Sequence, residues 1–294
     1  MLSILIPVYN YNVYPLVLEI KQLADALGIK YEILVQDDLS QKFIIENTAI
    51  TALQNCSYSI NHQNLGRGKN INLLCSKSKY EYVLILEADS FPCTKLYLKN
   101  YVVLLSRSTT IIFGGVKYTD SIPPKEKKLR WKYGLYRETK SLKHRLKNNY
   151  DFVFTWNLVL RKDILLKYPF PEFITEYGYE DLVFIKNLQL NSVPIHHIEN
   201  PLIHDNTESS KDFIAKTETA VTTLYTLINS QKLAYKDAKL TLIYLFLKKA
   251  GLIGIIKAIY TKSKPFLLKN LMSDNPNLYL LDYYKLGYYC NLKK

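Results

Sequence analysis

The sequence predicts an α/β fold in which a mostly parallel central sheet is flanked by helices. Three almost uninterrupted apolar runs, at residues 2–8, 31–35 and 82–86, have the length and composition of buried strands. The segments between them carry apolar residues at helical spacing. Buried strands that alternate with helices are typical of parallel sheets, because the helical crossovers cover both faces.

Each element of the first hundred residues follows from a local signal. The chain opens directly into the strand at 2–8, since neither a basic stretch nor a small-residue cleavage site follows Met1. A helix at 16–27 ends at Gly28, and the strand at 31–35 ends abruptly in acidic residues. The same signals predict a helix at 43–54, a short strand at 58–61, a helix at 68–76 and the strand at 82–86.

The remainder of the chain is more basic and increasingly helical. Residues 121–149 predict a basic loop followed by an amphipathic helix, for which a plain solvated helix face is the alternative. Residues 211–294 predict helices, with a break near 274–276. We therefore expect a main domain over residues 1–225 and a basic, Tyr-rich helical extension over residues 226–294.

Charge and cysteine content bear on partners and location. The 294 residues carry a formal net charge of +13, which predicts an anionic partner unless it reflects a Lys-rich coding bias. The cysteines include no CxxC pair and fit free thiols in a reducing, cytoplasmic compartment: Cys56, Cys75, Cys93 and Cys290.

The apolar segment at 240–260 has two interpretations. Lys248 and Lys249 interrupt it, and a central Lys pair is costly in a bilayer core, so a membrane span is not expected. The segment predicts either a peripheral helix on the anionic inner face of the plasma membrane, or a helical hairpin packed on the main domain or in a dimer. In the second case the hairpin breaks near Gly251 and Gly254.

Polar and acidic residues gather where the predicted parallel strands end. Tyr9-Asn10 follows the first strand, Asp37-Asp38 the second, and Glu87-Ala88-Asp89 the strand at 82–86. Ligands of open α/β sheets bind beyond these carboxyl ends. Neither GxGxxG nor a P-loop follows the first strand, so a phosphate ligand requires a different counter-charge, and a carboxylate-held metal is the obvious one.

Each candidate group has a structural alternative. Glu87 and Asp89 point to one side of a strand and suit a metal and a ribose, or they cap a turn. Asp37-Asp38 suits a uracil-like base or ribose, or closes an Asx turn. Glu180-Asp181 begins a predicted helix and offers a general base, or simply favours the helix dipole. His204 is a distant metal ligand or a structural histidine.

Taken in order, these residues resemble the motifs of family 2 glycosyltransferases. The resemblance covers roughly residues 2–225. The segments that carry it are Pro7-Val8-Tyr9-Asn10, Asp37-Asp38-Leu39-Ser40, Asn64-Leu65-Gly66-Arg67, Glu87-Ala88-Asp89, Thr155-Trp156-Asn157, Gly178-Tyr179-Glu180-Asp181 and Pro201 to His204. Single motifs of this kind are weakly specific, whereas their shared order is strongly so.

The resemblance implies a GT-A fold and an inverting transfer of a hexosyl or N-acetylhexosaminyl group. The donor would be a nucleotide sugar, expected to be a UDP-sugar, and the acceptor a hydroxyl of a glycan or lipid-linked glycan in surface polysaccharide or oligosaccharide synthesis. Asp89 and His204 would hold Mn²⁺ or Mg²⁺. Asp181 would be the base, with Glu180 beside it holding acceptor hydroxyls. The implied donor-binding residues are Pro7, Val8, Tyr9, Asp38, Asn64, Arg67, Glu87 and Ala88, and the candidates for acceptor stacking are Trp156, Tyr177 and Tyr179.

Two departures from the family pattern keep other functions in view. Glu87 stands where Asp is usual, and Leu39 where Gly is common. Glu87 supports a degenerate GT-A protein that binds nucleotide sugar, or scaffolds other enzymes, without turnover. A nucleotidylyltransferase would require a Gly-rich loop after the first strand, and a nucleic-acid-binding protein would carry a recognisable motif. The presence of Asp89 and Asp181 favours an active enzyme.

Overall fold

The computed structural model describes residues 1–105, 111–205 and 208–292. These residues form two compact units. The first comprises the described residues of Met1–Thr119, Glu138–Thr175 and Glu180–Asp205, and the second those of Asp120–Arg137, Glu176–Tyr179 and Asn206–Lys294. The domain boundary expected after residue 225 falls inside a helix, α9 (Ser210–Asn229), and stays a prediction.

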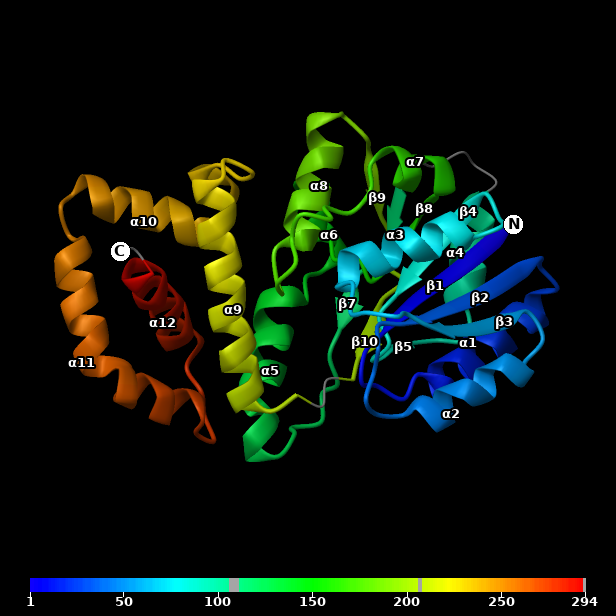
Figure 1. The fold of residues 1–294 in the computed structure, drawn as a ribbon, viewed down its shortest axis with the longest axis horizontal. Coiled ribbons are helices and arrows are strands. Elements are labelled where there is room, and N and C mark those ends of the chain that lie inside the picture. Colours follow the sequence, from blue (N-terminus) through cyan, green and yellow to red (C-terminus); the bar gives the residue numbers. More distant parts are fainter. Residues whose placement is uncertain (106–110, 206–207, 293–294) are drawn as a thin grey trace. The chain divides into compact units, whose positions relative to one another are not determined.

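A seven-stranded sheet forms the centre of the first unit (Figure 1). Four strands at one side pair in parallel, while β8 is antiparallel to both of its neighbours. The order across the sheet is β3 (Cys56–Ile60), β2 (Tyr31–Asp37), β1 (Leu2–Val8), β4 (Tyr82–Leu86), β8 (Asn157–Arg161), β6 (Ile111–Phe113) and β9 (Ile195–His197). The mostly parallel sheet is therefore confirmed.

The register of the parallel strands brings their carboxyl ends to one edge. Leu2 of β1 lies opposite Tyr31 of β2 and Tyr82 of β4, so the three strands start level. Val8 pairs with Asp37, and β4 ends at Leu86 just before Glu87. The acidic strand ends predicted from the sequence consequently share this edge.

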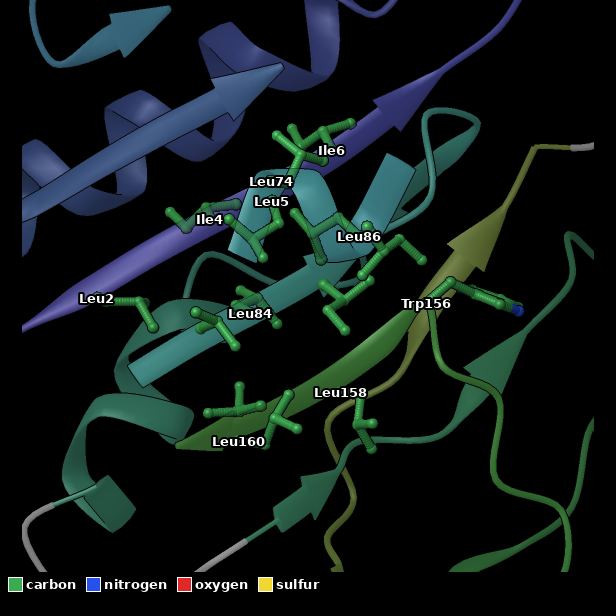
Figure 2. Close-up of a cluster of buried hydrophobic side chains, with 14 of the residues drawn as sticks. Leu2, Ile4, Leu5, Ile6, Leu74, Leu84, Leu86, Trp156, Leu158 and Leu160 are labelled. Carbon is green, nitrogen blue, oxygen red and sulfur yellow. The ribbon is translucent and has the colours of Figure 1, made fainter. Parts of the chain in front are cut away.

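The core of the sheet consists of the apolar runs that predicted it. Every residue of β1 is buried. Figure 2 shows Ile4, Leu84 and Leu158, from β1, β4 and β8, within one cluster of apolar side chains. The α-helices of the first unit are α1 (Tyr14–Leu27), α2 (Ile44–Thr48), α3 (Arg67–Lys77), α4 (Tyr97–Leu105), α6 (Leu142–Arg145), α7 (Lys162–Lys167) and α8 (Glu180–Leu190).

The helix predicted at 43–54 is not continuous. The structure has the short α2 followed by a 3₁₀ segment, Ala49–Ala52. Thr48 and Thr51 donate their hydroxyls to the carbonyls of Ile44 and Thr48, at 2.7 and 2.8 Å. Such back-bonding, together with β-branched crowding, disfavours a longer α-helix.

A second, three-stranded sheet was not predicted from the sequence. It has the order β5 (Ser90–Pro92), β10 (Leu202–His204) and β7 (Val116–Lys117). β10 is antiparallel to β5, with His204 opposite Ser90. This pairing brings His204 next to the end of β4, although the two are more than a hundred residues apart in the chain.

The second unit is helical, as predicted for the C-terminal region. Its α-helices are α5 (Lys128–Tyr133), α9, α10 (Lys239–Lys249), α11 (Ile253–Leu271) and α12 (Leu278–Asn291). A 3₁₀ turn at Lys125–Lys127 precedes α5, and a π-helical turn at Gly134–Glu138 follows it. Figure 1 shows α12 between α9 and α11.

Two predicted helix breaks are confirmed in the second unit. α10 and α11 are separate helices, with Gly251 between them at φ 72°. The break near 274–276 separates α11 from α12. In the described part of the chain, none of the helices combines the length and the apolarity needed to cross a membrane.

Candidate functional site

Asp37, the first acidic residue at the strand edge, closes a turn. Its carboxylate accepts the Ser40 backbone N–H at 2.7 Å and the Tyr58 hydroxyl at 2.6 Å. The Ser40 bond closes the turn after β2, as the structural alternative for this segment expected, but it spans three residues where an Asx turn spans two. Leu39, inside that turn, has φ 67°, a left-handed backbone that favours glycine. The departure from the family pattern at this position therefore carries backbone strain.

Asp38 shapes the loop that leads into α3. It is only 5% exposed. Its carboxylate accepts the backbone N–H groups of Leu65 and Gly66, each at 2.8 Å, and the Asn61 side-chain amide at 2.8 Å. Asp38 thus fixes the backbone that immediately precedes Arg67.

Gly66 has a backbone conformation that other residues rarely adopt. Its φ of 80° and ψ of 157° lie in a region populated essentially by glycine alone. The residue directly precedes α3, so this conformation sets the direction in which the helix starts. Arg67, the first residue of α3, is thereby aimed across the sheet edge.

Arg67 connects three elements at the strand edge. Its Nε donates to Glu87 Oε2 at 3.2 Å, its Nη1 to Asp181 Oδ1 at 2.9 Å, and its Nη2 to Thr155 Oγ1 at 3.0 Å. The side chains of Arg67, Glu87 and Asp181 are 20%, 28% and 30% exposed, so water screens their charges only in part. Residues predicted separately from the sequence therefore form one cluster.

Asp181 is the second residue of α8, and its carboxylate is held from two sides. Glu180 and Asp181 both lie in the first turn of this helix, where negative charge also favours the helix dipole. Thr155 donates its hydroxyl to Asp181 Oδ1 at 2.5 Å, and its backbone N–H approaches Oδ2 at 3.4 Å. Oδ1 therefore has two donors, whereas Oδ2 has a single long contact.

The cluster holds more carboxylates than cations. Burial acts to lower the pKa of Arg67, but the carboxylates of Glu87, Asp181 and Glu180 outweigh it and raise that pKa. Burial raises the pKa of Glu87; Arg67 opposes the rise, while Asp89 and Asp181 add to it. Arg67 stays charged, and a further cation would be stabilised beside these carboxylates.

Asp89 and His204 form the second predicted pair. His204 Nε2 lies 3.5 Å from Asp89 Oδ1, and the Asp205 backbone N–H donates to the Asp89 carbonyl at 2.8 Å. Trp156 packs edge-on against the His204 ring, with the ring centroids 5.1 Å apart, and Tyr118 stacks on the same ring at a centroid distance of 5.4 Å. The pairing of β5 with β10 thus holds an imidazole beside a carboxylate.

This pair fits a divalent cation whose other coordination positions are filled by a bound ligand. Among the residues described by the structure, no group of three or more His, Cys, Asp or Glu side chains is arranged to hold a metal. Mg²⁺ in nucleotide enzymes is commonly bound by one or two carboxylates, with phosphate oxygens and water filling the other positions. One carboxylate and one imidazole beside further acidic groups meet that requirement, and imidazole also suits Mn²⁺.

The other predicted donor residues lie around the same edge. Pro7 and Val8 are buried at the end of β1, and Tyr9 after them is 54% exposed. Ala88 is buried between Glu87 and Asp89. Asn64 accepts the Gly66 N–H at 3.1 Å and so belongs to the loop shaped by Asp38.

The three residues expected to stack on an acceptor differ in their surroundings. Trp156 is 7% exposed and packs against His204. Tyr177 and Tyr179 belong to the second unit. Tyr177 is 54% exposed, and Lys216 lies over its ring at 5.6 Å.

Sequence reasoning missed several groups that build the site. Thr155 was noted only as a neighbour of Asn157, and its sequence context gives no sign that it contacts Asp181. Asn157 is fully buried, where its Oδ1 accepts the hydroxyls of Tyr97 and Tyr101 at 2.6 and 2.8 Å. Its Nδ2 donates to the carbonyls of Gly115 and Asn200, at 2.7 and 3.0 Å. An Asn within an apolar strand was the available signal for such a network.

Comparison with known proteins gives one family and several similar folds. Residues 3–168 match the family model described as Glycosyl transferase family 2. No curated protein matches the chain significantly. A crystal structure of S. aureus TarS is 19% identical with a TM-score of 0.48; the match covers 75% of this chain and 39% of that one. The chain therefore spans well under half of that TarS chain.

Two further solved structures are similar over most of their length. The mannosyltransferase PcManGT from Pyrobaculum calidifontis, solved with GDP-Man and Mn²⁺, is 13% identical with a TM-score of 0.54, covering 97% of this chain and 86% of that one. The mannosyl-3-phosphoglycerate synthase from Rubrobacter xylanophilus is 15% identical with a TM-score of 0.55, covering 80% and 76%. At these identities the similarity is one of fold, and it confirms the predicted architecture.

Proposed function

Because this chain belongs to glycosyl transferase family 2, we propose that it moves a sugar from a nucleotide-sugar donor to an acceptor hydroxyl with inversion of configuration. The observation that carries the proposal is the cluster at the carboxyl ends of β1, β2 and β4. There Asp181 is joined to Glu87 through Arg67, and Asp89 lies beside His204. A base for the acceptor and ligands for a diphosphate-bound cation are thus offered together.

Asp181 is the proposed general base. As the acceptor oxygen forms its bond to the anomeric carbon, its proton passes to Asp181 Oδ2, the oxygen with the single long contact. The bond between the anomeric carbon and the diphosphate oxygen breaks, and the nucleoside diphosphate leaves with the electron pair. Attack from the face opposite the leaving group inverts the configuration in one displacement.

The donor side is proposed to lie over the ends of β1 and β2. The exposed Tyr9 follows the buried Pro7 and Val8 and offers a ring for the base, while Asp38 holds the loop of Asn64 and Arg67 in place. We propose a UDP-sugar as the donor, with a hexosyl or N-acetylhexosaminyl group. The PcManGT structure contains GDP-Man, so guanosine donors belong in the same screen.

Asp89 and His204 are the proposed ligands of Mn²⁺ or Mg²⁺. When bound, the cation neutralises charge on the departing diphosphate. We propose that Glu87, which is salt-bridged to Arg67, lies beside the metal and contacts the donor ribose or a bound water. The longer Glu side chain reaches Arg67 at 3.2 Å, which gives this departure from the usual Asp a structural role.

The acceptor and the cellular location are also proposals. We propose a glycan or lipid-linked glycan acceptor in surface polysaccharide or oligosaccharide synthesis, with Glu180, Trp156, Tyr177 and Tyr179 as candidate contacts. A lipid-linked acceptor suits a cytoplasmic enzyme that contacts the inner face of the plasma membrane.

The charge and exposure of α10 and α11 support such a membrane contact. Residues 239–272 include seven lysines and no acidic residue. One face of α11 packs Tyr260, Leu267 and Leu271 in the core of the second unit. On the outside, Phe246, Ile255, Ile259 and Phe266 are 69%, 56%, 51% and 65% exposed. Apolar side chains flanked by lysines are typical of helices that lie on anionic membranes.

Vesicle flotation tests this contact. We expect the protein to float with vesicles containing phosphatidylglycerol and to remain behind with phosphatidylcholine alone, and replacement of Phe246 and Phe266 by Ser to abolish flotation. Flotation that is absent, or unchanged in that variant, would exclude the contact. Self-association of the same face is disfavoured because two copies would bring lysines against lysines.

A donor screen tests the transferase. Release of nucleoside diphosphate is measured with UDP-, GDP- and dTDP-sugars in Mn²⁺, Mg²⁺ or EDTA. We expect turnover of one donor, abolished by EDTA. The alternative is a degenerate protein, and the engagement of all three Arg67 nitrogens by carboxylates and a hydroxyl is the observation that favours it. Donor binding without turnover in any metal would select that alternative.

A further inference from the structure

Thr155 lies between the two charged groups that define the base. It is fully buried two residues before the start of β8. Its hydroxyl oxygen is 3.0 Å from Arg67 Nη2 and 2.5 Å from Asp181 Oδ1. Its backbone nitrogen is 3.4 Å from Asp181 Oδ2. Both the backbone and the side chain of Thr155 therefore face the carboxylate.

The direction of these hydrogen bonds is determined by chemistry. A guanidinium can only donate and an ionised carboxylate can only accept. The Thr155 hydroxyl must therefore accept from Arg67 and direct its single proton to Asp181 Oδ1. Arg67 Nη1 donates to the same oxygen at 2.9 Å. Oδ1 is thus saturated, and Oδ2 keeps a lone pair for a proton from an acceptor.

Thr155 is also held rigidly. Asn157, two residues later, pairs with Leu86 at the end of β4. The buried side chain of Asn157 accepts two tyrosine hydroxyls and donates to two backbone carbonyls. This buried network therefore fixes the position of Thr155 relative to the sheet core and to β4, the strand that ends just before Glu87.

We infer that Thr155 is a positioning residue: it turns the Asp181 carboxylate so that Oδ1 is held by the protein and Oδ2 faces the acceptor. The inference rests on the proposed role of Asp181 as base. Thr155 itself touches no reacting atom in this account. Its contribution is the orientation of the carboxylate, and misplacement by about 1 Å can cost roughly 100-fold in rate.

The test compares two substitutions that differ mainly in the hydroxyl. Thr155→Val keeps the shape and removes the hydroxyl, and Thr155→Ser keeps the hydroxyl and removes a methyl group. Turnover is followed as release of nucleoside diphosphate from the donor found in the screen, with water as acceptor. We expect kcat to fall roughly 10- to 100-fold in Thr155→Val, with donor KM within about twofold of wild type. Thr155→Ser should restore kcat to within about threefold.

A purely structural role gives a different pattern. It would raise donor KM together with the loss of kcat, or leave Thr155→Ser as impaired as Thr155→Val, and either result overturns the inference. Unchanged kcat in Thr155→Val also overturns it. If Thr155→Val does not fold, Thr155→Ala provides the same comparison without a buried methyl group facing Arg67.

Asp181→Asn, measured in parallel, separates this inference from the proposed function. If Asp181→Asn turns over the donor like wild type, the proposed base is wrong and the inference falls with it. If Asp181→Asn is inactive while Thr155→Val is fully active, only the positioning role is wrong.

Discussion

Gly66→Ala is the substitution whose effect follows most directly from backbone geometry. A Cβ at this position would meet only the Thr175 carbonyl, at 4.0 Å, so the expected cost comes from the backbone and not from a clash. Holding a residue other than glycine in this region costs about 1–3 kcal/mol. Reduced freedom of the unfolded chain returns about 0.4–1 kcal/mol. The net loss should be about 1–2 kcal/mol, which corresponds to roughly 2–8 °C in Tm for a unit of this size.

The same substitution should impair the site. If the chain relieves the strain by turning the peptide, the Leu65 and Gly66 N–H groups leave the Asp38 carboxylate and Arg67 leaves Glu87 and Asp181. We therefore expect donor turnover to fall along with Tm.

Differential scanning calorimetry and the donor-release assay measure both effects. Gly254→Ala is the matched control, because Gly254 is the second residue of α11 and nothing lies within 4 Å of its Cβ position. That control should keep or slightly raise the wild-type Tm and leave turnover unchanged. A Gly66→Ala protein with the Tm and the turnover of wild type would show that alanine adopts this backbone conformation without cost.

Three further substitutions test other parts of the structure. Leu39 is 38% exposed and has φ 67°. Leu39→Gly should remove about 1–2 kcal/mol of left-handed strain and lose about 0.5–1 kcal/mol in unfolded-state entropy. Tm should therefore stay level or rise, and a lower Tm would contradict this. Burial lowers the pKa of His197, whose Nδ1 lies 3.1 Å from Arg145 Nη1 and whose Nε2 lies 2.9 Å from the Asn149 carbonyl. The stability that neutral His197 provides is complete above the unfolded pKa of about 6.5 and is lost as pH falls through the lower folded pKa. His197→Gln should therefore lose less stability than wild type between pH 7.5 and 5.5. Equal losses of the two proteins in urea titrations would contradict this prediction. A Cβ on Gly287 would lie 2.2 Å from Tyr260 Cδ2. Gly287→Ala should therefore force α11 and α12 apart and cost about 1–3 kcal/mol of stability. A melting curve like that of wild type, measured by circular dichroism, would show that the two helices are not packed so closely.

The sequence was most informative where one face or both faces of an element are buried. β1 and β4 have the bounds predicted for them, because uninterrupted apolar runs have few other uses in a globular chain. The acidic strand ends were predictable for the same reason: once the strands are known, parallel pairing brings their carboxyl ends together.

Contacts between distant segments were not predictable from local patterns. The β5–β10 pairing that brings His204 to Asp89 involves strands of three residues each, too short for a period-2 signal. Motif order suggested the pair only through family resemblance. The hydroxyl of Thr155 and the network around Asn157 depend on tertiary packing, which a single sequence does not encode in any local spacing.

Asp89 gives the most direct test of the central claim, that the strand edge is a metal-dependent site of sugar transfer. The measurement is the rate of nucleoside diphosphate release by wild type and by Asp89→Ala, with the same donor and increasing Mn²⁺ or Mg²⁺. We expect metal to activate the wild type, and Asp89→Ala to stay inactive at every metal concentration while keeping a wild-type Tm. A folded Asp89→Ala protein that releases nucleoside diphosphate at the wild-type rate would contradict this claim.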